Sequence, residues 1–188
     1  MAAEGGISWY ETMDVESRAL EILERAGVKE GQIVLDFGCG SGTYTIPAAK
    51  IVGDKGKVYA LDKDSTVLNE LMNRAESAGL NNIPRIDTSG EPKVDLADDS
   101  VDLVLLFDVL HPYYFPQADN RRKVLNEVHR ISKAKALIIV YPKHMESEAK
   151  NEIEKANFCL ESECSGTLIH DNKDLEDGRV LIFTKRQK

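Results

Sequence analysis

Long apolar runs are missing from this chain of 188 residues. No stretch approaches the roughly 20 predominantly apolar residues that a transmembrane helix needs. The first residues, MAAEGGISWYETMD, have no basic segment followed by an apolar core, which is the pattern of a secretory signal. We therefore expect no membrane span and a cytoplasmic location.

Cysteine is scarce, and Cys39, Cys159 and Cys164 are an odd number with no C-x-x-C pair. This argues against a disulfide framework and fits a reducing compartment. Cys159 and Cys164 fall in one expected strand at an odd spacing, so we expect them on opposite faces of it. This placement argues against joint ligation of a metal, and we expect no metal site.

A surplus of basic residues is also missing, because 24 lysines and arginines face 32 aspartates and glutamates. The formal net charge of −8 argues against a protein that holds nucleic acid by its phosphates. We expect a small molecule as partner rather than a nucleic acid.

Short apolar runs alternate with amphipathic segments along the chain, which is typical of an α/β protein. Helices are expected over residues 14–27, 43–52, 65–79, 121–131 and 146–157. Strands are expected over 33–37, 57–62, 83–87, 101–109, 135–142, 158–169 and 179–185, with a polar loop before the last. The alternation predicts a three-layer, doubly wound, Rossmann-like sandwich with a mostly parallel sheet that ends in an antiparallel hairpin.

One domain accounts for residues 1–188. We divide it into an N-terminal helical segment (1–30), a ligand-binding core (31–142) and a C-terminal helix with hairpin (143–188).

Residues 34–45 read VLDFGCGSGTYT and place glycine at positions 38, 40 and 42, directly after the first strand. Ligands of such sheets bind at the carboxyl ends of the strands. Glycine there permits a tight turn with positive φ and lets a ligand touch bare backbone.

Three kinds of ligand compete for this turn. A phosphate loop needs a lysine and a serine or threonine after the glycines, but the next lysine is Lys50. The dinucleotide pattern G-x-G-x-x-G needs its third glycine at position 43, which is Thr43 in this chain. In addition, the carboxylate of Asp36 would repel a pyrophosphate. A phosphate-free ribose ligand with a positive end fits better, because Asp36 then attracts it and Asp62 can accept from both ribose hydroxyls. S-adenosylmethionine has this shape.

The stretches VLDFGCGSGTYT and GKVYALDKD, with SVDLVLLFDVLHPY (100–113) and LNEVHRI (125–131), resemble the class I S-adenosylmethionine-dependent methyltransferases. The similarity is greatest to the small-molecule branch around the ubiquinone and menaquinone biosynthesis enzymes. The resemblance implies a seven-stranded sheet in the order 3-2-1-4-5-7-6.

For the site, the resemblance implies that the backbone of Gly38, Gly40 and Gly42 passes beneath the methionine of S-adenosylmethionine. Asp36 would orient the amino group of that methionine, and Asp62 would bind the ribose hydroxyls. Lys63 would flank the adenine, and Asp108 would face the sulfonium. Asp87 and Glu91 are rival contacts to the adenine amino group.

The implied reaction is in-line transfer of the methyl group to a small-molecule acceptor, which leaves S-adenosylhomocysteine. His111 can act as a general base or as a structural hydrogen-bonding residue, and Tyr113, Tyr114 and Phe115 beside it can line an acceptor pocket. A noncatalytic S-adenosylmethionine-binding protein of the same fold is the alternative, and a nicotinamide-dependent oxidoreductase is disfavoured by the displaced third glycine.

One departure from the family is the segment before the fifth strand, Ser132-Lys133-Ala134-Lys135-Ala136, which replaces a turn rich in proline and glycine. We expect it to change only a turn away from the cofactor.

Overall fold

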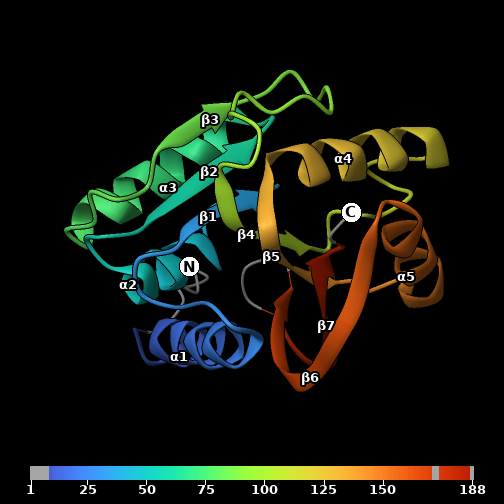
Figure 1. The fold of residues 1–188 in the computed structure, drawn as a ribbon. Helices are drawn as coiled ribbons and strands as arrows, with labels where there is room; N and C mark the ends of the chain where they lie inside the picture. The colour runs from blue at the N-terminus through green and yellow to red at the C-terminus, as the bar shows by residue number, and fades with distance from the viewer. Residues whose placement is uncertain (1–8, 171–173, 187–188) are drawn as a thin grey trace, which may run out of the picture.

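The computed structural model describes residues 9–170 and 174–186, which form five helices and seven strands. In chain order these are α1 (Trp9–Ala26), β1 (Ile33–Phe37), α2 (Thr45–Val52), β2 (Lys57–Asp62), α3 (Ser65–Ser77), β3 (Arg85–Asp87), β4 (Val101–Phe107), α4 (Ala118–Ile131), β5 (Ser132–Tyr141), α5 (Glu146–Lys155), β6 (Phe158–His170) and β7 (Asp174–Lys185). Figure 1 shows helices on both faces of one sheet, which confirms the predicted three-layer architecture.

The seven strands form one sheet in the order β3-β2-β1-β4-β5-β7-β6, as the family resemblance implies. The strands from β3 to β5 pair in parallel, and β7 runs antiparallel to both β5 and β6. Because β1 has β2 on one side and β4 on the other, the strand order reverses at β1. The carboxyl ends of these central strands are therefore where such a sheet opens a crevice.

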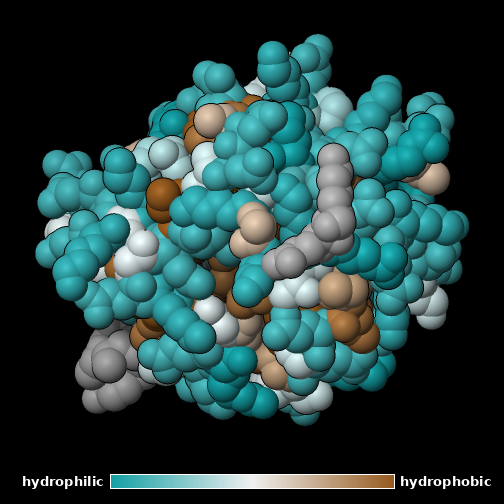
Figure 2. Space-filling model, in the orientation of Figure 1, coloured by the Kyte–Doolittle hydropathy of each residue, from teal (hydrophilic) through white to brown (hydrophobic). Residues whose placement is uncertain are grey.

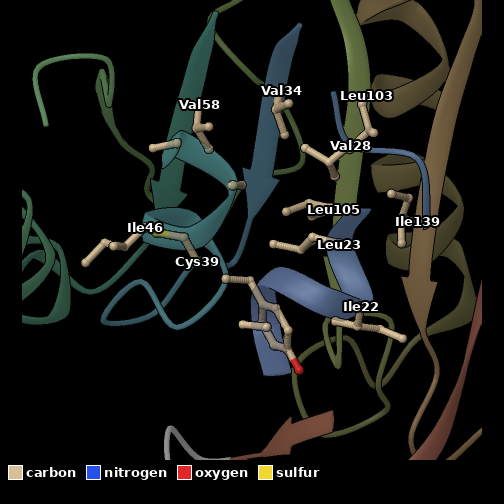
Figure 3. Close-up of a cluster of buried hydrophobic side chains, with 14 of the residues drawn as sticks. Ile22, Leu23, Val28, Val34, Cys39, Ile46, Val58, Leu103, Leu105 and Ile139 are labelled. Carbon is tan, nitrogen blue, oxygen red and sulfur yellow. The ribbon is translucent and has the colours of Figure 1, made fainter. Parts of the chain in front are cut away.

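One face of the sheet is covered by α1, α2 and α3. Side chains from four neighbouring strands point toward α1 in Figure 3, where the labelled set from these elements is Val58, Val34, Leu103, Leu105, Ile139, Ile22 and Leu23. The opposite face packs on α4 and α5 through a second cluster that includes Leu125, Val128 and Ile153. Since both faces are buried, the central strands are almost entirely apolar in sequence.

The face of the molecule drawn in Figure 2 is predominantly polar. Hydrophilic residues dominate the face drawn in Figure 2, and apolar side chains show there only in separate small patches and recesses. Among the described residues, none of the helices combines the length and apolar character that crossing a bilayer would demand.

The C-terminal hairpin is longer than predicted. We expected β7 to begin at residue 179, but it begins at Asp174, because pairs such as Leu168 with Glu176 continue the ladder into the polar segment. The register of β6 also shifts between Leu160 and Ser162. That bulge puts Cys159 and Cys164 on the same face of the sheet, which corrects the expected opposite placement.

The segment 132–136 is part of β5 and not a turn before it. The strand starts at Ser132, directly after α4, and its register against β4 is interrupted between Val101 and Leu103. Lys135 adopts a positive φ of 64° within this interruption. The residues that replace proline and glycine therefore form an irregular strand start, at the amino end of β5 and away from the crevice.

Tyr44 joins the first crossover to the hairpin. Its hydroxyl accepts the Ile169 N–H at 2.8 Å and donates to the Ile169 carbonyl at 3.3 Å. Burial raises the pKa of this hydroxyl above its usual range. One side chain thus ties α2 and β6, which are far apart in sequence.

The Tyr44→Phe variant removes both hydrogen bonds and keeps the ring. We expect the free energy of unfolding to fall by about 1–3 kcal/mol, because the buried polar groups of Ile169 lose their partner. Urea unfolding measures this. The control is Tyr59→Phe in β2, whose ring packs against the second core cluster, and an equal loss in both variants would contradict the assigned role of Tyr44.

Candidate functional site

A cavity of about 430 Å³ lies at the carboxyl ends of β1, β2, β4 and β5. Each of these strands contributes its last residue or residues, and the glycine loop, the loop after β3, the segment between β4 and α4 and the end of β6 form the rest of the wall. The lining is Asp36–Gly40, Thr43, Tyr44, Leu61–Lys63, Thr88–Glu91, Phe107–Val109, Tyr114, Phe115, Tyr141 and Ile169. The cavity therefore sits where the topology predicts a ligand.

The glycine loop is fastened to the end of β2 by its own backbone. The N–H groups of Gly38 and Cys39 donate to the Leu61 carbonyl at 2.8 and 3.0 Å, and the Gly40 N–H donates to Asp62 Oδ2 at 2.9 Å. Gly38 and Gly40 have φ of +75° and +52°, and both line the cavity. A Cβ on Gly40 would meet no atom within 4 Å, so the main chain of Gly40 borders open space, whereas a Cβ on Gly38 would lie 2.9 Å from Val109 Cγ2.

Gly42 does not line the cavity. Its φ is +90°, and a Cβ there would lie 2.1 Å from Leu71 Cδ1 of α3. Gly42 is therefore needed for the packing of α3 against the loop, while Gly38 and Gly40 face the cavity. The implied place of Gly42 beneath a cofactor finds no support in this arrangement.

Asp36, at the end of β1, is buried and lines the cavity. Its Oδ2 accepts a hydrogen bond from the Thr45 hydroxyl at 2.6 Å. Burial raises the pKa of this carboxyl to about 7, the nearby Asp62 charge adds to the increase, and the Thr45 bond opposes it. A cation in the cavity would favour the ionised form of Asp36.

Asp62 and Lys63 follow β2 and both line the cavity. The two carboxylate oxygens of Asp62 accept the N–H groups of Gly40 and Asp64, at 2.9 and 3.0 Å. These bonds fix the orientation of the carboxylate and leave lone pairs for hydroxyl donors. The Lys63 ammonium lies 5.9 Å from the centre of the Tyr114 ring.

The structure separates the rivals Asp87 and Glu91. Asp87 is exposed, pairs with Arg85 through two hydrogen bonds of 2.7 and 2.5 Å, and does not line the cavity. Its pKa is lowered by that arginine. Glu91 lines the cavity with the rest of its loop, which is joined to β2 by a bond of 3.2 Å from the Thr88 N–H to the Asp62 carbonyl.

Aromatic rings form the wall on the β4 and β5 side. Phe107 lies between Tyr44 and Tyr141, with ring centres 4.1 and 6.4 Å apart. The Tyr141 hydroxyl donates to Glu176 of β7. Asp108 follows with a positive φ of 53°, donates its N–H to the Tyr141 carbonyl at 2.9 Å, and lines the cavity.

Sequence reasoning missed Tyr44, Thr45 and Tyr141. Tyr44 and Thr45 lie two and three residues after Gly42, where the sequence pattern points only to a missing phosphate-binding lysine. Tyr141 ends an apolar strand at the ligand edge, and that position was a usable signal. No sequence signal marks Ile169 as a residue of the cavity, because its position beside the cavity depends on the length of the hairpin.

His111 does not line the cavity. Its Nδ1 accepts the Tyr113 N–H at 3.0 Å, and its ring meets that of His144 edge-on, with centres 4.9 Å apart. This nitrogen is occupied by a backbone donor, so the geometry shows a structural hydrogen bond. Of the aromatic residues that follow, Tyr114 and Phe115 line the cavity and Tyr113 does not.

A family model described as a methyltransferase domain matches residues 28–183. The chain belongs to this methyltransferase family. The resemblance predicted from the glycine loop and the fourth strand is therefore confirmed, and S-adenosylmethionine is the cofactor of the class that it named.

Two curated relatives match parts of the chain. A probable cobalt-precorrin-6B C(15)-methyltransferase (decarboxylating) of Saccharolobus solfataricus is 45% identical over 69 residues, which are 36% of this chain and 34% of that protein. The demethylmenaquinone methyltransferase of Geobacillus stearothermophilus is 29% identical over 113 residues, which are 60% of this chain and 46% of that protein. The chain thus spans less than half the length of these relatives.

A solved structure shares the fold over nearly the whole chain. The SAM-dependent methyltransferase from Aquifex aeolicus superposes with a TM-score of 0.69 at 22% identity, and the match covers 95% of this chain and 98% of that one. At this identity the likeness supports the fold alone.

The two different uses of glycine predict different defects. Gly42→Ala should destabilise the fold by about 2 kcal/mol or more, because its Cβ would overlap Leu71 and the positive φ adds strain. Gly40→Ala carries only the strain of φ +52° and should destabilise it by about 1 kcal/mol. Thermal or urea unfolding ranks the two, and an equal loss would contradict the separation.

Asp36 predicts a dependence of stability on pH. A folded-state pKa of about 7, above the usual 3.8, favours folding most below pH 4, and this contribution is lost as pH rises to 7. The unfolding free energy of the protein minus that of Asp36→Asn should therefore fall between pH 4 and 7, by up to about 4 kcal/mol, and then level off.

Urea titrations at several pH values measure this difference. Asp87→Asn is the matched control, because the lowered pKa of Asp87 gives a contribution that is present above pH 4 and lost as pH falls. A difference for Asp36→Asn that does not change with pH would show that the carboxyl is not perturbed.

Proposed function

We propose that the protein binds S-adenosylmethionine in this cavity and transfers its methyl group to a small-molecule acceptor, with S-adenosylhomocysteine as product. The observation that carries the proposal is the open main chain of Gly40 beside the fixed carboxylate of Asp62, with Gly38 in the same cavity wall. Family membership supports the same activity. The free cysteines of the described residues fit a reducing compartment, so we also propose that the protein is cytoplasmic.

The charge of the cavity favours a cation without phosphate. Its described lining holds four carboxyl groups, Asp36, Asp62, Glu91 and Asp108, and one basic side chain, Lys63. A pyrophosphate would meet repulsion from these acids, whereas a sulfonium and an ammonium group would be attracted. A nicotinamide dinucleotide is therefore the poorer fit.

We assign the two ends of the cofactor by the strands that line them. Asp62 would accept from the ribose hydroxyls, with Glu91 and Lys63 beside the adenine. Asp36 and Asp108 would attract the positive methionine end above Gly38 and Gly40. These roles use the residues that the structure gathers at the cavity, and they leave out Gly42 and Asp87.

When bound, S-adenosylmethionine supplies an electrophilic methyl group on a sulfonium. The residues of this chain would hold and align the two reactants. Proximity and alignment of this kind can lower the activation free energy by about 7–11 kcal/mol. The rings of Phe107 and Tyr141 would keep water from the β5 side of the cavity. Because His111 lies outside the lining, we favour an acceptor that ionises readily, such as a phenol or an enol carbon, over one that needs a strong base.

Isothermal titration calorimetry with S-adenosylmethionine tests the assignment. We expect Asp62→Ala and Asp62→Asn to weaken binding by about 10-fold or more, since hydrogen bonds to a charged group each contribute about 1.5–3 kcal/mol. The neighbouring Asp64→Ala is the control, because Asp64 caps α3 by accepting from the Thr66 N–H.

Asp64→Ala should lower stability and leave the affinity within about 2-fold, since its capping bond is worth about 1 kcal/mol to the helix. Unchanged affinity in both Asp62 variants would refute the ribose assignment. Tight binding of a nicotinamide dinucleotide instead of S-adenosylmethionine would refute the proposed function.

A further inference from the structure

The segment between β4 and α4 is shaped by one histidine. The His111 carbonyl accepts the N–H groups of Tyr114 at 3.0 Å and Phe115 at 2.8 Å, and its Nδ1 accepts the Tyr113 N–H at 3.0 Å. Three consecutive backbone donors are thus bound by a single residue. Arg121 fixes the far end, because its Nη1 donates to the Phe115 carbonyl at 2.6 Å.

This turn separates two consecutive tyrosines. Tyr113 is 80% exposed and lies outside the cavity lining, whereas Tyr114 is 49% exposed and belongs to it. The two rings meet edge-on, with centres 5.2 Å apart. The two residues are chemically identical and adjacent in sequence, but their environments differ. A variant of Tyr113 is therefore a control for the same variant of Tyr114.

Tyr114 reaches across the crevice to the β2 side. Its ring centre lies 5.9 Å from the ammonium of Lys63, the residue after Asp62. Lys63 follows β2 and Tyr114 follows β4, and β1 lies between these two strands in the sheet, so the contact joins segments from both sides of β1. Gly90 also approaches Lys63, with its ideal Cβ position 3.9 Å from Lys63 Cδ, so the loop after β3 borders the same place.

We propose that Tyr114 is a cofactor-binding residue whose ring, positioned by His111, covers the nucleoside half of the bound cofactor. The proposal rests on the proposed function. It places the ring beside Asp62 and Lys63, which flank the ribose and adenine, and not beside Phe107 and Tyr141 on the β5 side. An aromatic face stacks on any nucleobase, and a lysine over the ring adds a cation–π contact.

His111 is a positioning residue in this account, acting through backbone bonds. The side chain of asparagine can accept the N–H two residues ahead in the same way as Nδ1 does, whereas leucine cannot. His111→Asn should therefore keep Tyr114 in place, and His111→Leu should not. A histidine that served as general base would not be replaced by asparagine.

Calorimetry with S-adenosylmethionine, S-adenosylhomocysteine and 5′-methylthioadenosine tests the proposal. We expect Tyr114→Ala to weaken all three by about 10-fold, which is the size of an aromatic–base contact, and Tyr114→Phe to stay within about 3-fold. Tyr113→Ala should stay within about 2-fold because its ring is outside the cavity. His111→Leu should weaken binding by about 3-fold or more, and His111→Asn should restore it.

Equal affinities for Tyr114→Ala and Tyr113→Ala would overturn this inference alone and leave the proposed function intact. A loss confined to the two ligands with a methionine moiety would overturn it too, because Tyr114 would then contact the amino-acid end. Failure of the unmodified protein to bind any of the three nucleosides would refute both.

Discussion

The site depends on the attachment of the glycine loop to the end of β2. Three successive N–H groups, of Gly38, Cys39 and Gly40, are bound there by the Leu61 carbonyl and the Asp62 carboxylate. The chain can leave β1 in this way only with positive φ at both glycines. The Asp62 carboxylate both orients the glycine loop and lines the cavity. The shape of the glycine loop and the position of this negative charge therefore depend on each other.

Electrostatics then determines which ligand suits that shape. Burial raises the pKa of Asp36, and the nearby charge of Asp62 adds to this increase. Burial therefore disfavours the ionised form of Asp36, and a cationic ligand in the cavity would favour it. The rings of Tyr44, Phe107 and Tyr141 form an apolar wall beside these charges. The Tyr44 and Tyr141 hydroxyls are bonded to the hairpin, so they hold the wall in place, and water has less room to screen the carboxylates on that side.

The mostly parallel sheet was predictable from its apolar strands, its strand order followed from the family resemblance, and the edge that carries the cavity followed because the last residues of parallel strands meet there. The rival roles of Asp87 and Glu91 were not resolved, although Arg85 and Asp87 are two residues apart in one strand and so share a face. Gly42 was grouped with the other two glycines, because its contact with Leu71 of α3 cannot be read from the local sequence pattern. The bonds of Tyr44 to Ile169 span 125 positions, and the polar start of β7 resembled a loop, so neither followed from local patterns.

A crystal structure of the protein with S-adenosylhomocysteine tests the central claim most directly. We predict electron density for the ribose hydroxyls on Asp62 and for the homocysteine along the backbone of Gly38 and Gly40, with the glycine loop still hydrogen-bonded to Leu61 and Asp62. Density for the nucleoside outside this cavity, or a glycine loop that leaves Asp62 when the ligand binds, would contradict it.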